Sequence, residues 1–157
     1  MKVLALDGIA QDGIDYLTKY SFIVDVKQTL TEDELIEIIP HYDILIIRSN
    51  TWITKDILKH AKNLKIIGRA GIGIDNIDIT EAKKRNIYVT NAPSGNTVSV
   101  AEHTIGLLIS LARHIPQANS QLKRGLWQRN ELVGVELAGK ILGIIGLGKA
   151  GKAVAQR

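Results

Sequence analysis

Short runs of hydrophobic residues alternate with longer amphipathic segments through the first part of this 157-residue chain. The runs are rich in Ile and Val and almost uninterrupted, as expected for parallel strands that are covered on both faces. The pattern predicts five strands: Val3–Leu6, Phe22–Val26, Ile44–Ile47, Leu64–Ile67 and Ile87–Thr90. Strands that alternate with helices in this way indicate an α/β fold with a doubly wound parallel sheet and right-handed crossovers.

The amphipathic segments between these strands carry their own helix start signals. Thr31 is followed three residues later by Glu34, and Asp78 is followed by Glu81 at the same spacing. This spacing is typical of a capping box or a close variant of it. Thr54 is placed to cap a further helix over residues 55–61.

A different pattern follows the last of these strands. Residues 98–113 read as one helix that is apolar on nearly every face beyond Ile105, so we expect it to be buried between two bodies. Pro116 should kink this helix or start a new one at Ile115. Gly125 is suited to end the second helix.

The last part of the chain contains a glycine pattern in a meaningful context. A predicted strand, Ile141–Ile145, runs into the GxGxxG segment at residues 146–151, which opens a predicted helix. This arrangement is typical of dinucleotide binding, whereas the glycine pattern alone would equally suit an ordinary strand-helix turn. The acidic residue that binds the ribose is expected about 20 residues further on, so NAD and NADP are not distinguished by the residues present.

Each position of the glycine segment has a physical role in such a turn. Gly146 permits the tight turn, Gly148 lets the backbone approach a pyrophosphate, and Gly151 lets helix and strand pack closely. The N–H groups of the helix start, near Lys149 and Ala150, would face the anion.

Composition and charge narrow the classes of partner. The net charge of +4 is spread along the chain without interleaved aromatic residues, so no nucleic-acid partner is expected and small anions remain suitable ligands. The absence of cysteine excludes a disulfide scaffold and a thiolate metal site, and it fits a cytoplasmic protein. The longest apolar stretch, residues 105–112, is shorter than the ~20 residues that span a bilayer, and a charged residue follows the start too soon for a signal peptide.

Candidate anion-binding residues follow the predicted strands. Arg48 comes directly after a strand, at the carboxyl edge where open parallel sheets bind ligands, and its guanidinium could bind a carboxylate or phosphate or form a structural salt bridge. Gly71 and Gly73 flank Ile72 after the next strand, where backbone N–H groups can converge on an oxyanion. Asn96 follows the fifth strand and could cap the long helix or bind a ligand.

Four segments in order resemble the D-2-hydroxyacid dehydrogenases, and especially their phosphoglycerate dehydrogenase branch. They are RSNTWIT at 48–54, GRAGIGIDNID at 68–78, NAPSGNTVSVAEHT at 91–104, and the stretch from Gly139-Lys140 to Arg157. The segment LARHIPQA at 111–118 is also similar. The resemblance extends over essentially the whole chain.

The resemblance implies three parts and an activity. They are a flavodoxin-like substrate-binding domain at 1–95, a bridging helix at 96–125, and the start of a truncated Rossmann domain for NAD at 126–157. The family moves hydride between C2 of a 2-hydroxy acid, here favoured as 3-phosphoglycerate of serine biosynthesis, and nicotinamide. Its catalytic Arg, Glu and His follow the glycine motif, beyond residue 157, so the chain alone is expected to be inactive, with a homodimer formed through the bridging helix and cofactor-domain region.

The resemblance also assigns the site residues, and it implies no metal. Substrate binding is expected of Arg48, Ser49, Arg69, Gly71, Gly73 and Asn96. Cofactor binding is expected of Ile72, Val100, Gly146, Gly148, Lys149, Ala150 and Gly151.

Other functions remain open from the residues. Glyoxylate, hydroxypyruvate or another 2-oxo acid would also suit an arginine beside a glycine loop. A non-catalytic ligand-binding or dimerisation fragment is a second class. A receiver or flavin protein would need acids at the ends of the first and third strands, where Asp7 fits and Arg48 does not.

Overall fold

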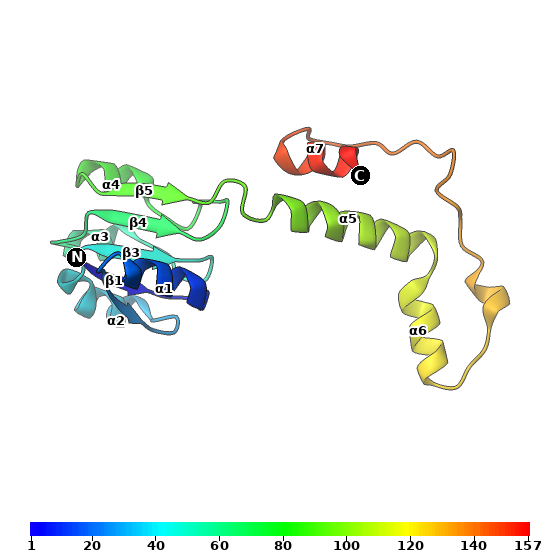
Figure 1. Ribbon diagram of the computed structural model, residues 1–157, viewed down its shortest axis with the longest axis horizontal. Helices are drawn as coiled ribbons and strands as arrows, with labels where there is room; N and C mark the ends of the chain where they lie inside the picture. The colour runs from blue at the N-terminus through cyan, green and yellow to red at the C-terminus, as the bar shows by residue number, and fades with distance from the viewer. The chain divides into compact units, whose positions relative to one another are not determined.

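The computed structural model describes residues 1–157 and divides them into two compact units, residues 1–95 and 96–157 (Figure 1). The first unit has five parallel strands in the order β2-β1-β3-β4-β5, which is the order of flavodoxin-like doubly wound sheets. The strands are β1 Lys2–Ala5, β2 Ile23–Val26, β3 Ile44–Ile47, β4 Ile66–Arg69 and β5 Tyr88–Asn91. The predicted α/β architecture is therefore confirmed; β3 has the predicted bounds, and those of the other strands shift by at most two residues.

Four helices connect these strands. They are α1 Gln11–Lys19, α2 Glu32–Ile38, α3 Lys55–His60 and α4 Ile79–Lys84, and a 3₁₀ turn, η1 Ile39–His41, extends α2. Helices α2, α3 and α4 contact one another along one face of the sheet, whereas α1 lies over the other face (Figure 1). Each crossover thus returns the chain to the same end of the sheet.

The core lies mainly between the sheet and the α2-α3-α4 layer. Leu4 on β1, Leu6 just after that strand, and Leu45 and Ile47 on β3 belong to this core and are fully buried. Val3 and Ala5 alternate with them toward the α1 face, because successive strand residues point to opposite faces.

The predicted helix caps are present. Thr31 forms a complete capping box with Glu34, and the side chains of Thr54 and Asp78 accept hydrogen bonds from the third residue of α3 and α4. These bonds satisfy backbone donors that a helix start would otherwise leave unpaired.

The expectation that all strands are covered on both faces holds only in the middle of the sheet. Ile23 on β2 is 63% exposed and Tyr88 on β5 is 78% exposed. Both strands lie at edges of the sheet, where fewer neighbouring elements cover them.

Polar side chains connect β1, the edge strand β2 and the segment before β3. The hydroxyl of Tyr42 donates to Asp25 Oδ2 at 2.8 Å, and Lys2 Nζ lies 3.3 Å from the same oxygen. Lys2 Nζ also lies 4.9 Å from the centre of the Tyr42 ring. Burial and the bond to Asp25 raise the pKa of Tyr42 to about 12, so its hydroxyl remains a donor at neutral pH.

The second unit is helical. It contains α5 Thr97–Ala112, α6 Ile115–Lys123, a 3₁₀ turn η2 Arg129–Leu132, and α7 Lys149–Gln156. Pro116 lies in the first turn of α6, and Gly125 follows its end with φ +73°, so the predicted start and end of this helix are correct.

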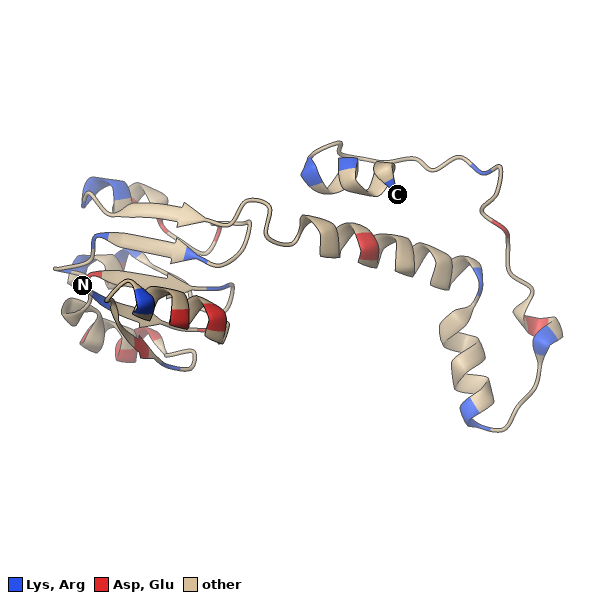
Figure 2. Ribbon diagram, viewed as in Figure 1, with Lys and Arg blue, Asp and Glu red and all other residues tan.

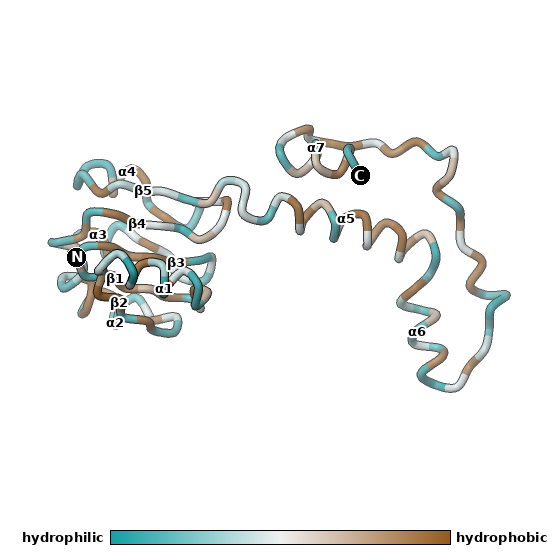
Figure 3. Tube along the Cα trace, in the orientation of Figure 1, coloured by the Kyte–Doolittle hydropathy of each residue, from teal (hydrophilic) through white to brown (hydrophobic).

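The predicted burial of the long helix is wrong for these residues. Hydrophobic residues recur along all of α5 (Figure 3), yet only Ala101 is buried, and Leu107 and Leu111 are 57% and 74% exposed. Its contacts within the unit are mainly with α7, which covers one side of the helix. An apolar helix is buried only where another element of the structure covers it.

Residues 141–145 are predicted to be an apolar strand, but one that finds no neighbouring strand within this chain. These residues form no strand, and Ile141 and Ile145 are fully exposed. A strand gains its hydrogen bonds from a neighbouring strand, and all five strands of this chain belong to the first unit. Hydrophobicity alone therefore does not organise this segment.

Charged residues are distributed over both units (Figure 2). Acidic residues predominate on α1 and α2, whereas α4 ends in two lysines. None of the helices is long and apolar enough to cross a membrane.

Replacing Tyr42 with Phe should lower the free energy of unfolding of the first unit by about 1 kcal/mol, because a partly buried hydrogen bond to a carboxylate is lost. Urea titration followed through the amide signals of β1 would measure this change. Tyr88→Phe removes an exposed hydroxyl and should change stability by less than about 0.5 kcal/mol. Equal losses in the two variants would contradict the role given to the Tyr42 hydroxyl.

Candidate functional site

The loops that follow β1, β3, β4 and β5 lie at one edge of the sheet, because all five strands are parallel (Figure 1). Ligands of open parallel sheets bind outside this carboxyl edge. Arg48, Ser49, Arg69 and the glycine loop at residues 71–73 all lie here. The predicted substrate residues of the first unit are thus brought to one edge.

Asp7 fastens the loop after β3. Its Oδ2 accepts the backbone N–H groups of Arg48 at 2.9 Å and Thr51 at 3.2 Å. Its Oδ1 accepts the hydroxyls of Thr51 and Thr29, both at 2.8 Å. Burial alone would raise the pKa of Asp7, but these hydrogen bonds outweigh it and lower the pKa, so the carboxylate is ionised at neutral pH.

Asn76 fastens the same loop from the other side. Its side-chain Nδ2 donates to the carbonyl oxygens of Arg48 at 2.8 Å and Thr51 at 2.6 Å. Asn76 is only 2% exposed. Residues 48–51 are therefore held at both ends by buried side chains.

The glycine loop presents two backbone donors. The N–H of Gly71 donates to the carbonyl of Arg69 at 2.8 Å, so it is not available to a ligand. The N–H groups of Ile72 and Gly73 have no protein acceptor. Asn91 fixes the loop by donating to the carbonyl of Ile72 at 2.5 Å. Two adjacent unpaired N–H groups are chemically suited to an anion.

The guanidinium of Arg69 packs against this loop. A Cβ atom added to Gly71 would overlap Arg69 Nη1, and one added to Gly73 would overlap Asp75 Oδ1. The Nε of Arg69 is buried without a hydrogen-bond acceptor. The guanidinium of Arg69 and the carboxylate of Asp75 therefore both lie beside the two free amides.

Arg48 and Ser49 are exposed, and their side chains make no hydrogen bond or ion pair with the protein. Asn96 belongs to the second unit. It occupies the N-cap position of α5, but its side chain makes no capping hydrogen bond. The capping role considered for Asn96 is thus not filled by its side chain here.

The glycine turn of the second unit has the backbone geometry that its sequence suggests. Gly146 has φ +93°, a conformation that strongly favours glycine, and Gly148 is the N-cap of α7. A Cβ at Gly151 would overlap the carbonyl oxygen of Gly146, whereas one at Gly148 would meet no atom within 4 Å. The turn is therefore tight at Gly146 and Gly151 and open at Gly148.

A groove of about 390 Å³ lies beside this turn, between α5, α7 and residues 142–146. It brings together Val100, Gly146, Ala150 and Gly151 from the predicted cofactor residues. Gly148 and Lys149 do not line it. The remaining lining is mostly aliphatic, as is common for small-molecule sites.

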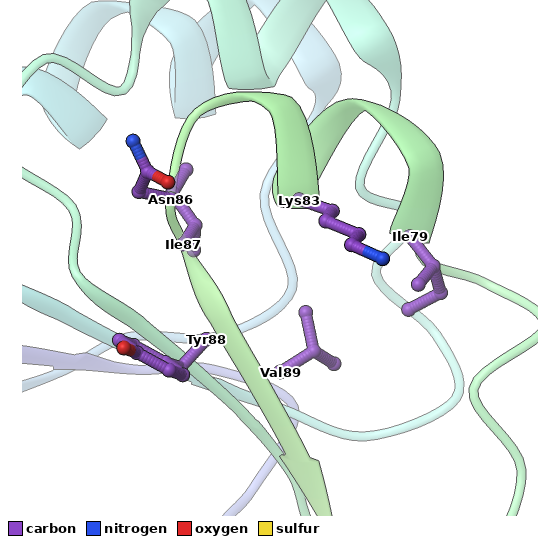
Figure 4. A pocket seen from close by; sticks show the side chains of 6 residues that line it. All are labelled: Ile79, Lys83, Asn86, Ile87, Tyr88 and Val89. Atoms are coloured by element: carbon purple, nitrogen blue, oxygen red, sulfur yellow. The ribbon is translucent and has the colours of Figure 1, made fainter.

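A second hollow, of about 300 Å³, lies between α4 and the edge strand β5 (Figure 4). The side chain of Lys83 extends over Ile79 at this hollow, which contains none of the predicted site residues. No group of three or more His, Cys, Asp or Glu side chains is placed to hold a metal ion.

The first unit thus has a flavodoxin-like sheet with arginines and unpaired amides at its carboxyl edge, and the second unit has a GxGxxG turn at the start of a helix. The chain belongs to the D-isomer specific 2-hydroxyacid dehydrogenases, because the sequence model of their catalytic domain matches residues 3–154.

Several curated relatives are similar along nearly the whole chain. D-3-phosphoglycerate dehydrogenase of Archaeoglobus fulgidus is 49% identical over 157 residues, which is all of this chain and 30% of the relative. Hydroxypyruvate reductase of Thermotoga maritima is 52% identical over 151 residues, which is 96% of this chain and 49% of the relative. The chain thus spans less than half the length of each of these relatives.

Solved structures share the fold. The TT0316 protein of Thermus thermophilus matches with a TM-score of 0.91 at 30% identity, over 99% of this chain and 52% of that one. An NAD-dependent formate dehydrogenase of Staphylococcus aureus, solved with NAD, matches with a TM-score of 0.83 at 28% identity over the same shares.

Sequence reasoning places the exposed residues at this edge and expects Asp75 and Asn76 to fix the glycine loop. It misses that Asn76 also holds the loop after β3, and it gives no structural role to Asp7 or Asn91. The available signal was position, since each polar residue lies at or directly after the end of a strand.

Replacing Gly151 with Ala should disrupt the start of α7, because the new methyl group would overlap the Gly146 carbonyl. Amide hydrogen exchange in residues 149–156 should accelerate at least about tenfold. Gly148→Ala is the matched control, since its methyl group meets open space, and exchange should stay near the parent rate. Equal exchange rates in both variants would contradict the tight packing at Gly151.

Proposed function

We propose that this chain binds the substrate, and forms the first part of the cofactor site, of an NAD-dependent dehydrogenase that oxidises C2 of 3-phosphoglycerate in serine biosynthesis. Residues 1–95 would be the substrate domain, residues 96–125 the bridging segment, and residues 126–157 the start of the cofactor domain. The proposal rests on the guanidinium of Arg48, which makes no hydrogen bond with the protein. Asn76 hydrogen-bonds the loop of Arg48 to the segment that follows the free amides of Ile72 and Gly73.

The chemistry of these groups suits a substrate with two anionic ends. The amides of Ile72 and Gly73 would bind the carboxylate, because adjacent unpaired N–H groups bind oxyanions. Arg48 and Arg69 would bind the phosphate, for which a planar guanidinium offers paired donors. Ser49 and Asn96 would add hydrogen bonds.

The glycine turn fits a dinucleotide. The open surface at Gly148 admits a pyrophosphate close to the backbone, and the first-turn amides of α7 near Lys149 and Ala150 suit its charge. Val100 and Ile72 would border the nicotinamide end. NAD, when bound, accepts the hydride that leaves C2. A formate dehydrogenase of the same fold binds NAD.

Hydride transfer also needs a base at the substrate hydroxyl. None of the residues assigned at the carboxyl edge has this role, and the resemblance implies that the family's Arg, Glu and His follow the glycine motif. We therefore expect these 157 residues to bind substrate without turning it over.

A second candidate is a hydroxypyruvate reductase, favoured by the 52% identity to the Thermotoga maritima enzyme. Hydroxypyruvate has a carboxylate but no phosphate. Its binding would depend on the glycine-loop amides more than on Arg48, so the phosphate group distinguishes the two candidates.

Replacing Arg48 with Gln should lower the affinity of the chain for 3-phosphoglycerate at least about tenfold, because charge-assisted hydrogen bonds to the phosphate are lost. The affinity would be measured by titration followed through amide chemical shifts, with the largest shifts expected at Arg48, Ile72 and Gly73. Hydroxypyruvate should show a smaller dependence on Arg48.

Lys83→Gln, at the hollow beside β5, is the control and should keep the parent affinity. Retention of full affinity by the Arg48 variant would overturn the proposal. Formation of reduced nicotinamide by the pure, mass-verified chain with NAD and 3-phosphoglycerate would contradict only the expected inactivity of these 157 residues.

The exposed apolar side chains of α5 favour a homodimer. Leu107 and Leu111 lie on the same side of the helix at i, i+4 spacing and are more than half exposed. Sedimentation velocity should show a species of twice 17.2 kDa that the double variant Leu107→Glu, Leu111→Glu converts to a monomer. Tyr16→Glu, on the first unit, should leave the dimer intact. A monomeric parent chain would refute this expectation.

A further inference from the structure

The loop at residues 48–51 is held through its backbone and the buried hydroxyl of Thr51, and not through its exposed side chains. Arg48 donates its N–H to Asp7 and offers its carbonyl to Asn76. Thr51 does the same with both of its backbone groups, at 3.2 Å and 2.6 Å. Asp7 follows β1 and Asn76 follows β4, the two strands that flank β3 in the sheet. The loop is therefore clamped from both sides.

We infer that Asp7 and Asn76 are positioning residues that aim Arg48 at the bound anion and tie it to the glycine loop. This inference rests on the proposed function. It adds two residues that do not touch the substrate but determine how well the arginine can bind it.

Asp7 and Asn76, which together form the clamp on the β3 loop, are too buried to contact a ligand directly. Asp7 is 9% exposed and Asn76 is 2% exposed, whereas Arg48 is exposed. All four hydrogen bonds of the Asp7 carboxylate go to protein donors. Neither residue is placed to bind a substrate, so an effect on binding must pass through the loop that they hold.

The backbone at Asp7 is unusual for a residue with a side chain. It has φ +64°, and Gly8 after it has φ +70°. Such left-handed residues cost energy and are found most often where the fold holds them for a purpose. Here the conformation coincides with the carboxylate reaching across to the β3 loop.

The clamp also connects the two anion-binding elements. Asn76 belongs to the segment that joins the glycine loop to α4, and that segment pairs with the chain after the β3 loop through the Ile53–Ile77 bridge. The spacing between Arg48 and the free amides of Ile72 and Gly73 is thus set by short hydrogen bonds. A fixed spacing reduces the entropy lost on binding a substrate with two charged ends.

The decisive experiment is a double-mutant cycle between Asp7 and Arg48 in the 157-residue chain. Asp7→Asn keeps a residue that tolerates positive φ but replaces one acceptor oxygen with a donor facing N–H or hydroxyl groups. Affinity for 3-phosphoglycerate should fall about tenfold, as expected for loss of a charge-assisted contact. The same substitution in the Arg48→Gln background should change affinity less than about twofold, because the two residues act as one unit.

Two outcomes would overturn the inference. One is parent affinity in a folded Asp7→Asn chain. The other is an equal loss in both backgrounds, which would mean that Asp7 acts on the fold in general. The amide proton signal of Arg48 gives an independent readout, since loss of its carboxylate acceptor should move it upfield.

Stability is separated from positioning by a control at the other end of β3. Tyr42→Phe removes a partly buried hydrogen bond between the segment before β3 and Asp25 on the edge strand β2, and it should lower stability without lowering affinity. If Asp7→Asn does not fold, Thr51→Val and Thr29→Val replace it. Both remove a hydroxyl bonded to Asp7 Oδ1 at 2.8 Å, but only Thr51 belongs to the loop. Thr51→Val should weaken binding more, and equal effects would overturn the inference.

Failure of the proposed function would look different. In that case Arg48→Gln would leave the binding of 3-phosphoglycerate unchanged, or no binding would be observed with the parent chain. Failure of the clamp alone would leave Arg48 essential for binding and Asp7 dispensable.

Discussion

The pairing of β1 with β2 on one side and β3 on the other is the constraint on which the first unit depends. Val3, Leu4 and Ala5 of β1 are fully buried, so their backbone groups must be satisfied by the two neighbouring strands. Because the strands are parallel, every loop that follows a strand emerges at the carboxyl edge of the sheet. The sheet therefore gathers polar residues that are far apart in the sequence, and this gathering makes an anion-binding edge possible.

A buried carboxylate at that edge is stable only because donors surround it. Asp7 accepts four hydrogen bonds, and these lower its pKa despite burial. Its negative charge is satisfied inside the protein and stabilises the loop from which the guanidinium of Arg48 projects. The edge thus combines a hydrogen-bonded anion below the surface with positive charge and free amides at the surface.

The two units differ in which of their predicted elements form. The first has a core enclosed by the sheet and three helices. The second has the tight glycine turn, fixed by the contact of Gly151 with Gly146, but its apolar segment at 141–145 lacks a neighbouring strand. The geometry of a turn depends on nearby residues, whereas a strand needs a neighbouring strand. The second unit therefore forms its glycine turn but no strand at residues 141–145.

The sequence by itself determined the alternation of strands and helices, the caps at Thr31, Thr54 and Asp78, and the glycine turn, because these features depend on neighbours within a few residues. It also brought Arg48 and the glycine loop to the correct edge, since strand direction follows from the α/β pattern. Only the tertiary structure decided that Asp7 and Asn76 hold the β3 loop. Their bonds to Arg48 join residues that are 41 and 28 positions apart, and hydrophobic periodicity carries no information about such pairs.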